Sequence, residues 1–337
     1  MLKIDIHTHI IPENLNDITS KFIDDRFLKI KIINKDSASL IKDGSEFRKI
    51  SCNCWDHKIR VSECNTMDIN IQILSTIPVL FSYWAKPNEG LKLSQFLNDH
   101  IYQVTCKNPD RFIGLGTIPM QDIDLSILEI DRCVNKLKFP GVIIGSNING
   151  INLSDKQFYP IFEYLEKIGC SIFIHPWEML GSKEIEKYWL PWLVGMPAET
   201  SRAICSIIFG GILDKFPKLK IAFAHGGGSI PFTIGRIDHG YNMRPDLCAI
   251  DNQKTPSSYL KSIYVDSLVH DRETLNFLIH KFGINQVALG SDYPFPLGEQ
   301  NIGKLIESLS LSDCEKTRIF SGTALEWLGL DENRFNR

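Results

Sequence analysis

The sequence predicts an α/β fold, a (β/α)8 TIM-like barrel with a small antiparallel β insertion after the first strand. Three observations support this prediction. Short apolar, β-branched runs recur eight times along 337 residues, segments of helical length separate them, and several of the runs end in a residue capable of chemistry. Near-continuously apolar strands that alternate with helices indicate a parallel sheet covered on both faces, and eight such units suggest a closed barrel. A doubly wound open sheet is the alternative.

Each of the eight runs is short enough to be one strand. Amphipathic stretches such as residues 90–107 and 123–139 lie between them, with apolar residues at the three- and four-residue spacing of helices. In chain order the runs are KIDIHTH, INIQILSTIP, RFIGLGTIP, PGVIIGS, CSIFIHP, LKIAFAHGG, SIYVDSL and QVALGSDYP.

Polar residues gather where the predicted strands end. In a strand, residues i and i+2 project from one face, so His7 and His9 point the same way. Taken alone, this pair could equally be two incidental histidines of a surface strand. The carboxyl ends of barrel strands converge on one mouth, however, and four further runs contribute a residue there. These residues are His175, His225, Asp266 and Asp292.

Three histidines and a carboxylate suit zinc, and also cobalt, iron or manganese. We expect His7, His9, His175 and Asp292 to bind the metal, leaving a position open for a water whose pKa the metal lowers. His225 would stand beside that water as general base and acid. The fourth run has no lysine at its end to bridge a second metal, so we predict a single ion.

The remaining ionisable candidates carry less weight. Asp266 could support the metal site from behind or cap a helix, and the sequence does not choose between these roles. Cys52 and Cys54 lack a second cysteine pair at zinc-ribbon spacing. The other histidines fall in predicted helices or loops and are treated as background: His57, His100, His239, His270 and His280.

Two regions interrupt the repeat of the single predicted domain, residues 1–337. Residues 12–56 follow the first strand and contain alternating runs joined by NKD and DGS turns, which predicts an antiparallel flap over the mouth. Lys42 and Arg48 in this flap could reach the site or decorate a solvated edge. The second region, KYWLPWLVGMPAET, is rich in Trp and Pro and would line a pocket or an interface, or form a buried loop.

Composition excludes several classes of partner. A formal net charge of −3 and a pI near 6.3, without a basic stripe, argue against nucleic acid and anionic membrane surfaces. We see no apolar run of membrane-spanning length and no secretory signal. Nine scattered cysteines, an odd number, fit reduced thiols and a cytoplasmic location better than a disulfide framework.

At this point the chain resembles a known family. HTH at the start, HPW after the fifth run, AHGGG after the sixth and GSDYPFPLGE after the eighth resemble the amidohydrolase superfamily. The segments NCWD, STIPVLFSYWAKP, RFIGLGTIPMQ, KYWLPWLVGMPAET, FPKLK and MRPDLCA extend the likeness to one group of decarboxylases within it. The resemblance runs over most of the chain and is weakest on helix surfaces and at both ends of the flap.

The resemblance implies more than spacing does. Members of that group are zinc-dependent and remove, without oxidation, one carboxylate from an aminocarboxymuconate semialdehyde on the kynurenine branch of tryptophan breakdown. Their ligand and acid/base positions match the residues named above. Their substrate-binding positions match Arg48, Trp192 and Arg236, and the last is expected to reach in from the neighbouring subunit of a homodimer.

Three rival functions remain. A metal-dependent hydrolase on the same scaffold would use the same water, but a neutral substrate would not need two arginines. Other decarboxylases of the superfamily, acting on aromatic acids, would share the metal site. A non-catalytic scaffold would be expected to have lost a ligand or the acid/base, and none is lost.

Overall fold

The computed structural model describes residues 1–335 and contains an eight-stranded parallel sheet, which confirms the predicted α/β barrel. Every predicted run forms one strand, and the strands are neighbours in chain order once the inserted hairpins are set aside. In order they are β1 (Ile4–Ile10), β5 (Ile71–Thr76), β6 (Phe112–Thr117), β7 (Gly141–Gly145), β10 (Ser171–His175), β11 (Ile221–Phe223), β12 (Tyr264–Asp266) and β13 (Val287–Ala288).

The barrel is closed by the loop that follows β13 rather than by β13 itself, which has two residues. The Ile6 amide donates to the carbonyl of Leu289 at 2.9 Å, and the His9 amide donates to that of Tyr293 at 2.8 Å. The Asp292 amide donates back to the carbonyl of His7 at 2.8 Å. These bonds bring Asp292 directly beside the first strand.

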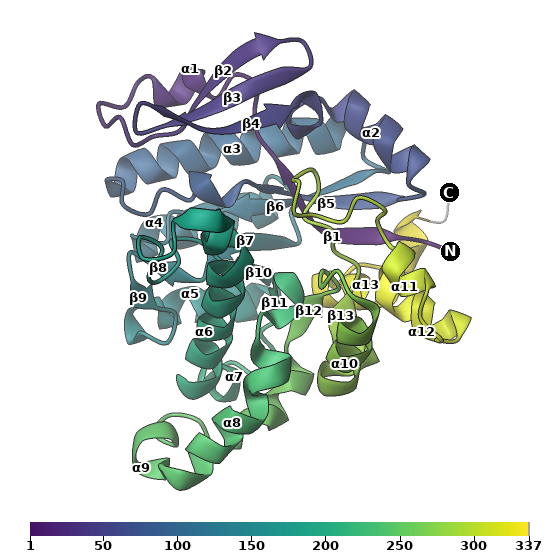
Figure 1. Ribbon diagram of the computed structural model, residues 1–337. Coiled ribbons are helices and arrows are strands. Elements are labelled where there is room, and N and C mark those ends of the chain that lie inside the picture. Colours follow the sequence, from purple (N-terminus) through teal and green to yellow (C-terminus); the bar gives the residue numbers. More distant parts are fainter. Residues whose placement is uncertain (336–337) are drawn as a thin grey trace.

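Helices cover the outside of the barrel (Figure 1). Several begin where the sequence provides a cap: Asp122 accepts from the Leu125 amide at 3.0 Å, and Asp271 accepts from the Thr274 amide at 2.7 Å. The helices of the outer layer are α2 (His57–Thr66), α3 (Pro87–Lys107), α4 (Ile123–Asn135), α5 (Tyr159–Ile168), α6 (Met196–Phe209), α7 (Ile212–Lys215), α10 (Arg272–Phe282), α11 (Lys304–Glu307), α12 (Asp313–Thr317) and α13 (Thr323–Leu328).

The predicted antiparallel insertion is present and lies at the top of Figure 1. After a short helix, α1 (Asn16–Thr19), strands β2 (Lys29–Asn34), β3 (Ser37–Lys42) and β4 (Ser45–Ser51) form a three-stranded sheet. Its buried face, including Leu40 and Ile50, belongs to the same apolar cluster as Leu93 and Leu97 of α3. A smaller hairpin, β8 (Asn147–Ile148) with β9 (Ile151–Asn152), follows β7.

A second projection extends from the barrel at the bottom left of Figure 1. It consists of α8 (Ile230–Met243) and α9 (Pro245–Cys248), and we call it the α8–α9 arm. Large apolar side chains of this arm and of the residues just after it face solvent: Phe232, Met243, Leu247 and Ile250 are 60–68% exposed. Within residues 1–335 no helix is long and apolar enough to cross a bilayer.

Candidate active site

Four histidines and one aspartate meet at the carboxyl end of the barrel, as the strand-end pattern predicts. The Nε2 atoms of His7 and His9 lie 3.2 Å apart. Asp292 Oδ1 lies 3.4 Å from His7 Nε2 and 3.1 Å from His9 Nε2. The ring centroids of His7 and His9 each lie 5.1 Å from that of His175, and the ring centroids of His175 and His225 lie 5.0 Å apart.

These separations fit the ligands of one ion. Tetrahedral zinc with bonds of about 2.1 Å holds its ligand atoms roughly 3.4 Å apart, close to the distances here. His7, His175, His225 and Asp292 each offer a ligand atom, and these atoms all lie within 4.8 Å of one another. His9 contacts two members of that group directly, so five candidate groups surround one point.

The hydrogen-bond partners of the Nδ1 atoms divide the histidines into two kinds. Nδ1 of His7 contacts Asp266 Oδ2 at 2.7 Å, that of His9 contacts the Thr76 carbonyl at 3.0 Å, and that of His175 contacts the Pro176 carbonyl at 2.9 Å. Such acceptors fix the proton on Nδ1 and leave the Nε2 lone pair for a metal. His225 Nδ1 has no such partner among the described residues.

Asp266 supports two of these histidines at once. Besides contacting His7, it accepts from the backbone amides of His225 and Gly226, each at 2.8 Å. A side chain at Gly290 would collide with both Asp266 and His7, since an added Cβ would lie 2.6 Å from the Cβ of Asp266 and 3.0 Å from that of His7. The sequence left the role of Asp266 open, and the structure places it behind the histidines.

Burial and charge adjust the acid–base properties of the centre. Burial lowers the pKa of His225 to about 4, with His7 adding to the effect, so its imidazole is neutral at pH 7. Although burial opposes it, the bond from His9 and the charges of His7 and His225 hold the pKa of Asp292 below its usual range. His225 and Asp292 also adopt left-handed backbone conformations, with φ of 57° and 58°.

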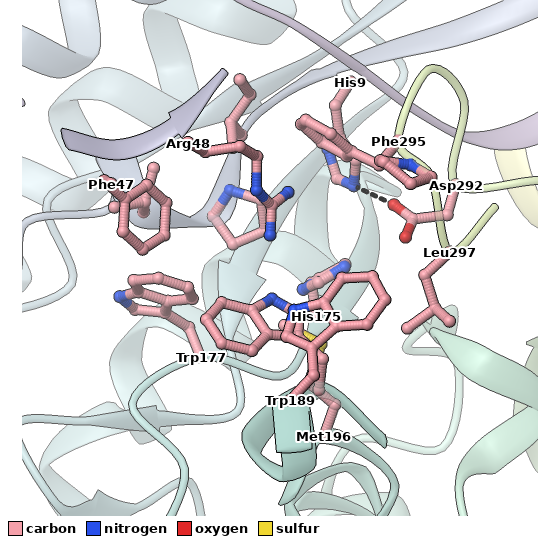
Figure 2. A pocket seen from close by; sticks show the side chains of 15 residues that line it. His9, Phe47, Arg48, His175, Trp177, Trp189, Met196, Asp292, Phe295 and Leu297 are labelled. Atoms are coloured by element: carbon pink, nitrogen blue, oxygen red, sulfur yellow. Dashed lines mark ion pairs between the residues drawn. The ribbon is translucent and has the colours of Figure 1, made fainter. Parts of the chain in front are cut away.

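An aromatic pocket opens in front of the centre (Figure 2). Arg48 points into it from β4, and the His9–Asp292 pair borders the same space. Trp192, predicted from the resemblance, lines the pocket together with Phe47, Trp177, Trp189, Met196 and Phe295. The KYWLPWLVGMPAET segment therefore supplies pocket wall. Lys42 does not line the pocket, and its Nζ lies 5.4 Å from the centroid of the Trp177 ring.

A second chamber adjoins the first on the side of His225. It shares Trp192, Met196, Asp292 and Leu297 with the aromatic pocket, and adds His225, Leu268, His270 and Thr274. His270, which its predicted position in a loop or helix left as background, thus lines this chamber from the segment after β12. Arg236, in contrast, lies on the exposed surface of α8 and lines neither space.

Comparison with known proteins identifies the family. Residues 77–330 match the family model described as amidohydrolase, which covers three quarters of the chain. The chain belongs to the amidohydrolase family. The expectation drawn from its motifs is thereby confirmed.

Two relatives have the same printed name. 2-Amino-3-carboxymuconate-6-semialdehyde decarboxylase from Dictyostelium discoideum is 54% identical over 99% of this chain and 93% of its own length. The protein of that name from Caenorhabditis elegans is 36% identical over 98% and 95%, respectively. This resemblance and the predicted carboxy-lyase class are confirmed: the chain is a decarboxylase of the amidohydrolase superfamily.

A solved structure shares the fold. The 5-carboxyvanillate decarboxylase from Novosphingobium aromaticivorans, which contains bound manganese, superposes with a TM-score of 0.84 over 98% of this chain and 97% of that one, at 24% identity. The dihydroxybenzoic acid decarboxylase from Polaromonas sp. JS666, also solved with bound manganese, superposes with a TM-score of 0.80 over 100% of this chain and 99% of that one, at 22% identity. The His/Asp cluster at the barrel mouth has the donors and spacing for such an ion.

Proposed function

We propose that this protein is a zinc-dependent decarboxylase that converts 2-amino-3-carboxymuconate 6-semialdehyde to 2-aminomuconate 6-semialdehyde. The substrate has two carboxylates and loses one without oxidation, in the kynurenine pathway of tryptophan degradation. The observation that carries the proposal is the position of Arg48, a guanidinium that points into an aromatic pocket bordered by the metal-binding candidates. The relatives named for this reaction support the choice of substrate.

Arg48 is available to a substrate carboxylate. Within residues 1–335 no carboxylate pairs with its guanidinium, which lies 4.9 Å from the ring centroid of Phe295 and 5.6 Å from those of Phe47 and Trp192. Burial lowers its pKa, which reflects the cost of holding the charge there unpaired. A substrate carboxylate would relieve that cost through paired, charge-assisted hydrogen bonds.

The metal would be held by His7, His9, His175 and Asp292, and when bound it supplies Lewis acidity for polarising water or substrate oxygen. His225 is proposed as the acid/base rather than a fifth ligand, because its Nδ1 lacks the acceptor that the other three rings have. It is neutral at pH 7, so it can accept a proton and return it to the carbon from which CO2 leaves.

The second arginine is proposed to come from a partner subunit. Arg236 is exposed on α8 and forms no ion pair within residues 1–335. It shares its arm with the exposed side chains of Phe232, Met243 and Leu247, and exposed apolar groups of this size mark interaction surfaces. A homodimer that buries this arm would place one subunit's Arg236 at the other's pocket.

The remaining features agree with a compact cytoplasmic enzyme. The nine cysteines are free, which suits a reducing compartment. We further propose that residues 1–337 act as one domain and that residues 12–56 act as its flap, because Arg48 and Phe47 of that segment reach the pocket. The partner of the active site is a small molecule, and the acidic net charge argues against nucleic acid.

A comparison of three substrate classes in parallel assays tests the proposal. The zinc-loaded protein would be mixed in parallel with the freshly generated semialdehyde, with an aromatic acid such as 5-carboxyvanillate, and with a lactone, and CO2 release or hydrolysis would be followed. We expect kcat/KM for the semialdehyde to exceed that for the aromatic acid by at least 100-fold. Preference for the aromatic acid would assign the chain to the other decarboxylases, and lactone hydrolysis without CO2 release would make it a hydrolase.

A further inference from the structure

Arg60 of α2 is a fully buried cation without a counter-ion. Its side chain is 0% exposed and, within residues 1–335, it forms no ion pair with a carboxylate. Arginine is almost never fully buried unless it is paired, because removing its charge from water is costly. Nothing in the catalytic proposal uses this residue, so its burial needs another explanation.

The guanidinium instead joins separate segments of the chain through neutral acceptors. It donates to the carbonyl of His9 at the end of β1, to the carbonyl of Asn53 at 3.2 Å, and to Gln72 Oε1 of β5 at 3.1 Å. Its Cζ also lies 4.7 Å from the centroid of the Tyr293 ring, a cation–π contact. One side chain thus contacts β1, β5, the end of the flap and the loop after β13.

These contacts fall where the barrel is least regular. β13 has two residues, so the closure between the first and last strands depends on loop bonds, among them the one from the His9 amide to the Tyr293 carbonyl. Arg60 contacts both residues of that bond. His9 and Asp292, the residue before Tyr293, are in turn 3.1 Å apart at the centre.

The hydroxyl of Tyr293 donates a hydrogen bond to the carboxylate of Glu63, one turn further along α2. The same helix therefore holds the Asp292–Tyr293 turn at two points, through Arg60 on the ring face and Glu63 on the hydroxyl. A metal site loses affinity when its ligands can move apart, since each must be held within a few tenths of an ångström.

We propose that Arg60 is a positioning residue that holds His9 and Asp292 at metal-binding separation across the closure of the barrel. The inference rests on the metal centre proposed above. Arg60 itself touches neither metal nor substrate. Arginine suits this role because its planar guanidinium carries several donors and can bond three acceptors and contact an aromatic ring at the same time.

Cobalt binding to the purified, metal-free protein tests this role without a turnover assay. We expect Arg60→Met and Arg60→Lys to weaken Co2+ binding by about 10–100-fold and to change the visible spectrum of the bound ion. Lysine keeps the charge but cannot make all the contacts, so it should not restore affinity. Recovery of full affinity in Arg60→Lys, or unchanged affinity in both variants, would overturn the proposal.

Arg111 provides the matched control. Its guanidinium also bonds two backbone carbonyls, those of Asn70 and Ile69, each at 2.8 Å, but at the opposite end of β5 from the site. Arg111→Met should lower the thermal unfolding temperature without changing Co2+ affinity. A loss of affinity equal to that of Arg60→Met would show that general destabilisation explains both, and would contradict a positioning role.

A milder variant covers the case in which the Arg60 variants do not fold. Gln72→Met removes one of the three acceptors and preserves side-chain volume, and we expect at least a twofold weaker affinity with a shifted spectrum. Affinity equal to that of the wild type would refute the proposal. Failure of the wild-type protein itself to bind Co2+ or Zn2+ would instead remove the metal centre, and the inference with it.

Discussion

The barrel mouth and the α8–α9 arm differ in how completely one chain builds them. At the mouth, His7, His9 and His175 are almost fully buried, and the Nδ1 atom of each has a hydrogen-bond partner. On the arm, Arg236 and its apolar neighbours face solvent. The histidine–aspartate cluster is therefore formed within one subunit, whereas the second substrate-binding arginine that we propose depends on another.

Because of this difference, metal binding and turnover can be tested separately from substrate binding, whereas a single active-site variant usually changes them together. Changes at the mouth should affect metal or turnover in every subunit independently. Changes on the arm should affect substrate binding, and should be repairable by a subunit that is defective elsewhere.

Replacing the acid/base should have the greatest effect on turnover. His225→Asn should reduce kcat by about 100- to 10,000-fold, the usual contribution of general acid–base catalysis, because the variant lacks the imidazole that we propose transfers the proton. Zinc content measured by atomic emission should remain at one ion per subunit. Loss of the metal in this variant would make His225 a ligand instead.

Removing a ligand should separate metal binding from catalysis. Apparent zinc-binding energies of about 10–16 kcal/mol shared by four ligands leave about 3 kcal/mol for each, so His9→Ala should weaken binding roughly 100-fold. Competition with a chelator measures this constant. His280→Ala, an exposed histidine on α10, is the control and should bind as the wild type does. Equal affinities would exclude His9 from the site.

The flap arginine should affect substrate binding. Arg48→Ala removes charge-assisted bonds worth about 1.5–3 kcal/mol, so kcat/KM should fall by about 10–100-fold with the metal still bound. Lys42→Ala, on the same hairpin but not among the residues that line the pocket, should change kcat/KM by less than about twofold. A comparable loss in both variants would point to flap conformation rather than to carboxylate recognition.

Mixing two inactive variants should restore activity if Arg236 acts across the subunit interface. Arg236→Ala and His225→Asn homodimers should each be inactive or nearly so, and equal mixing followed by subunit exchange should restore about a quarter of wild-type activity if the site is shared. Half of the dimers would then contain one intact site. Mixed dimers that form, as judged by mass spectrometry, yet remain inactive would show that Arg236 does not act across the interface.

The smallest expected effect concerns the stability contributed by Glu299, whose amide donates to the carbonyl of Ser291 in the loop after β13. Burial raises the pKa of Glu299 to about 7 from the ordinary 4.5, so its contribution to stability is complete below pH 4.5 and is lost as pH rises through 7. At pH 8, Glu299→Gln should therefore unfold at a higher temperature than the wild type, with a free energy of unfolding larger by about 1–2 kcal/mol. At pH 4.5 the two proteins should unfold at nearly the same temperature. Glu163→Gln, at an exposed position on α5, is the matched control substitution.

Sequence patterns predicted most of this fold because the strands are regular. All eight β-branched runs form barrel strands, and their carboxyl-terminal residues meet as the topology requires. The closure of the barrel was not predictable in detail. QVALGSDYP reads as a full strand, yet only two residues of it pair with β12, and the loop from Leu289 to Tyr293 completes the ring through bonds to β1.

The supporting residues carried weaker signals than the histidines. A strand-end aspartate such as Asp266 can cap a helix or bond a ring, and only the three-dimensional position distinguishes the two. Arg60 lies in HKIRVSECNT, whose polar composition is typical of a surface helix. Its burial depends on the flap and the Tyr293 loop, which cover it. Contacts between distant segments leave no local pattern.

The identity of the product tests the central claim most directly. Freshly generated 2-amino-3-carboxymuconate 6-semialdehyde cyclises to quinolinate without an enzyme, whereas the decarboxylated semialdehyde cyclises to picolinate. We predict that the zinc-loaded protein diverts product from quinolinate to picolinate and that the metal-free protein does not. Undiminished quinolinate in the presence of fully metal-loaded protein would contradict the proposed substrate while leaving the metal centre intact.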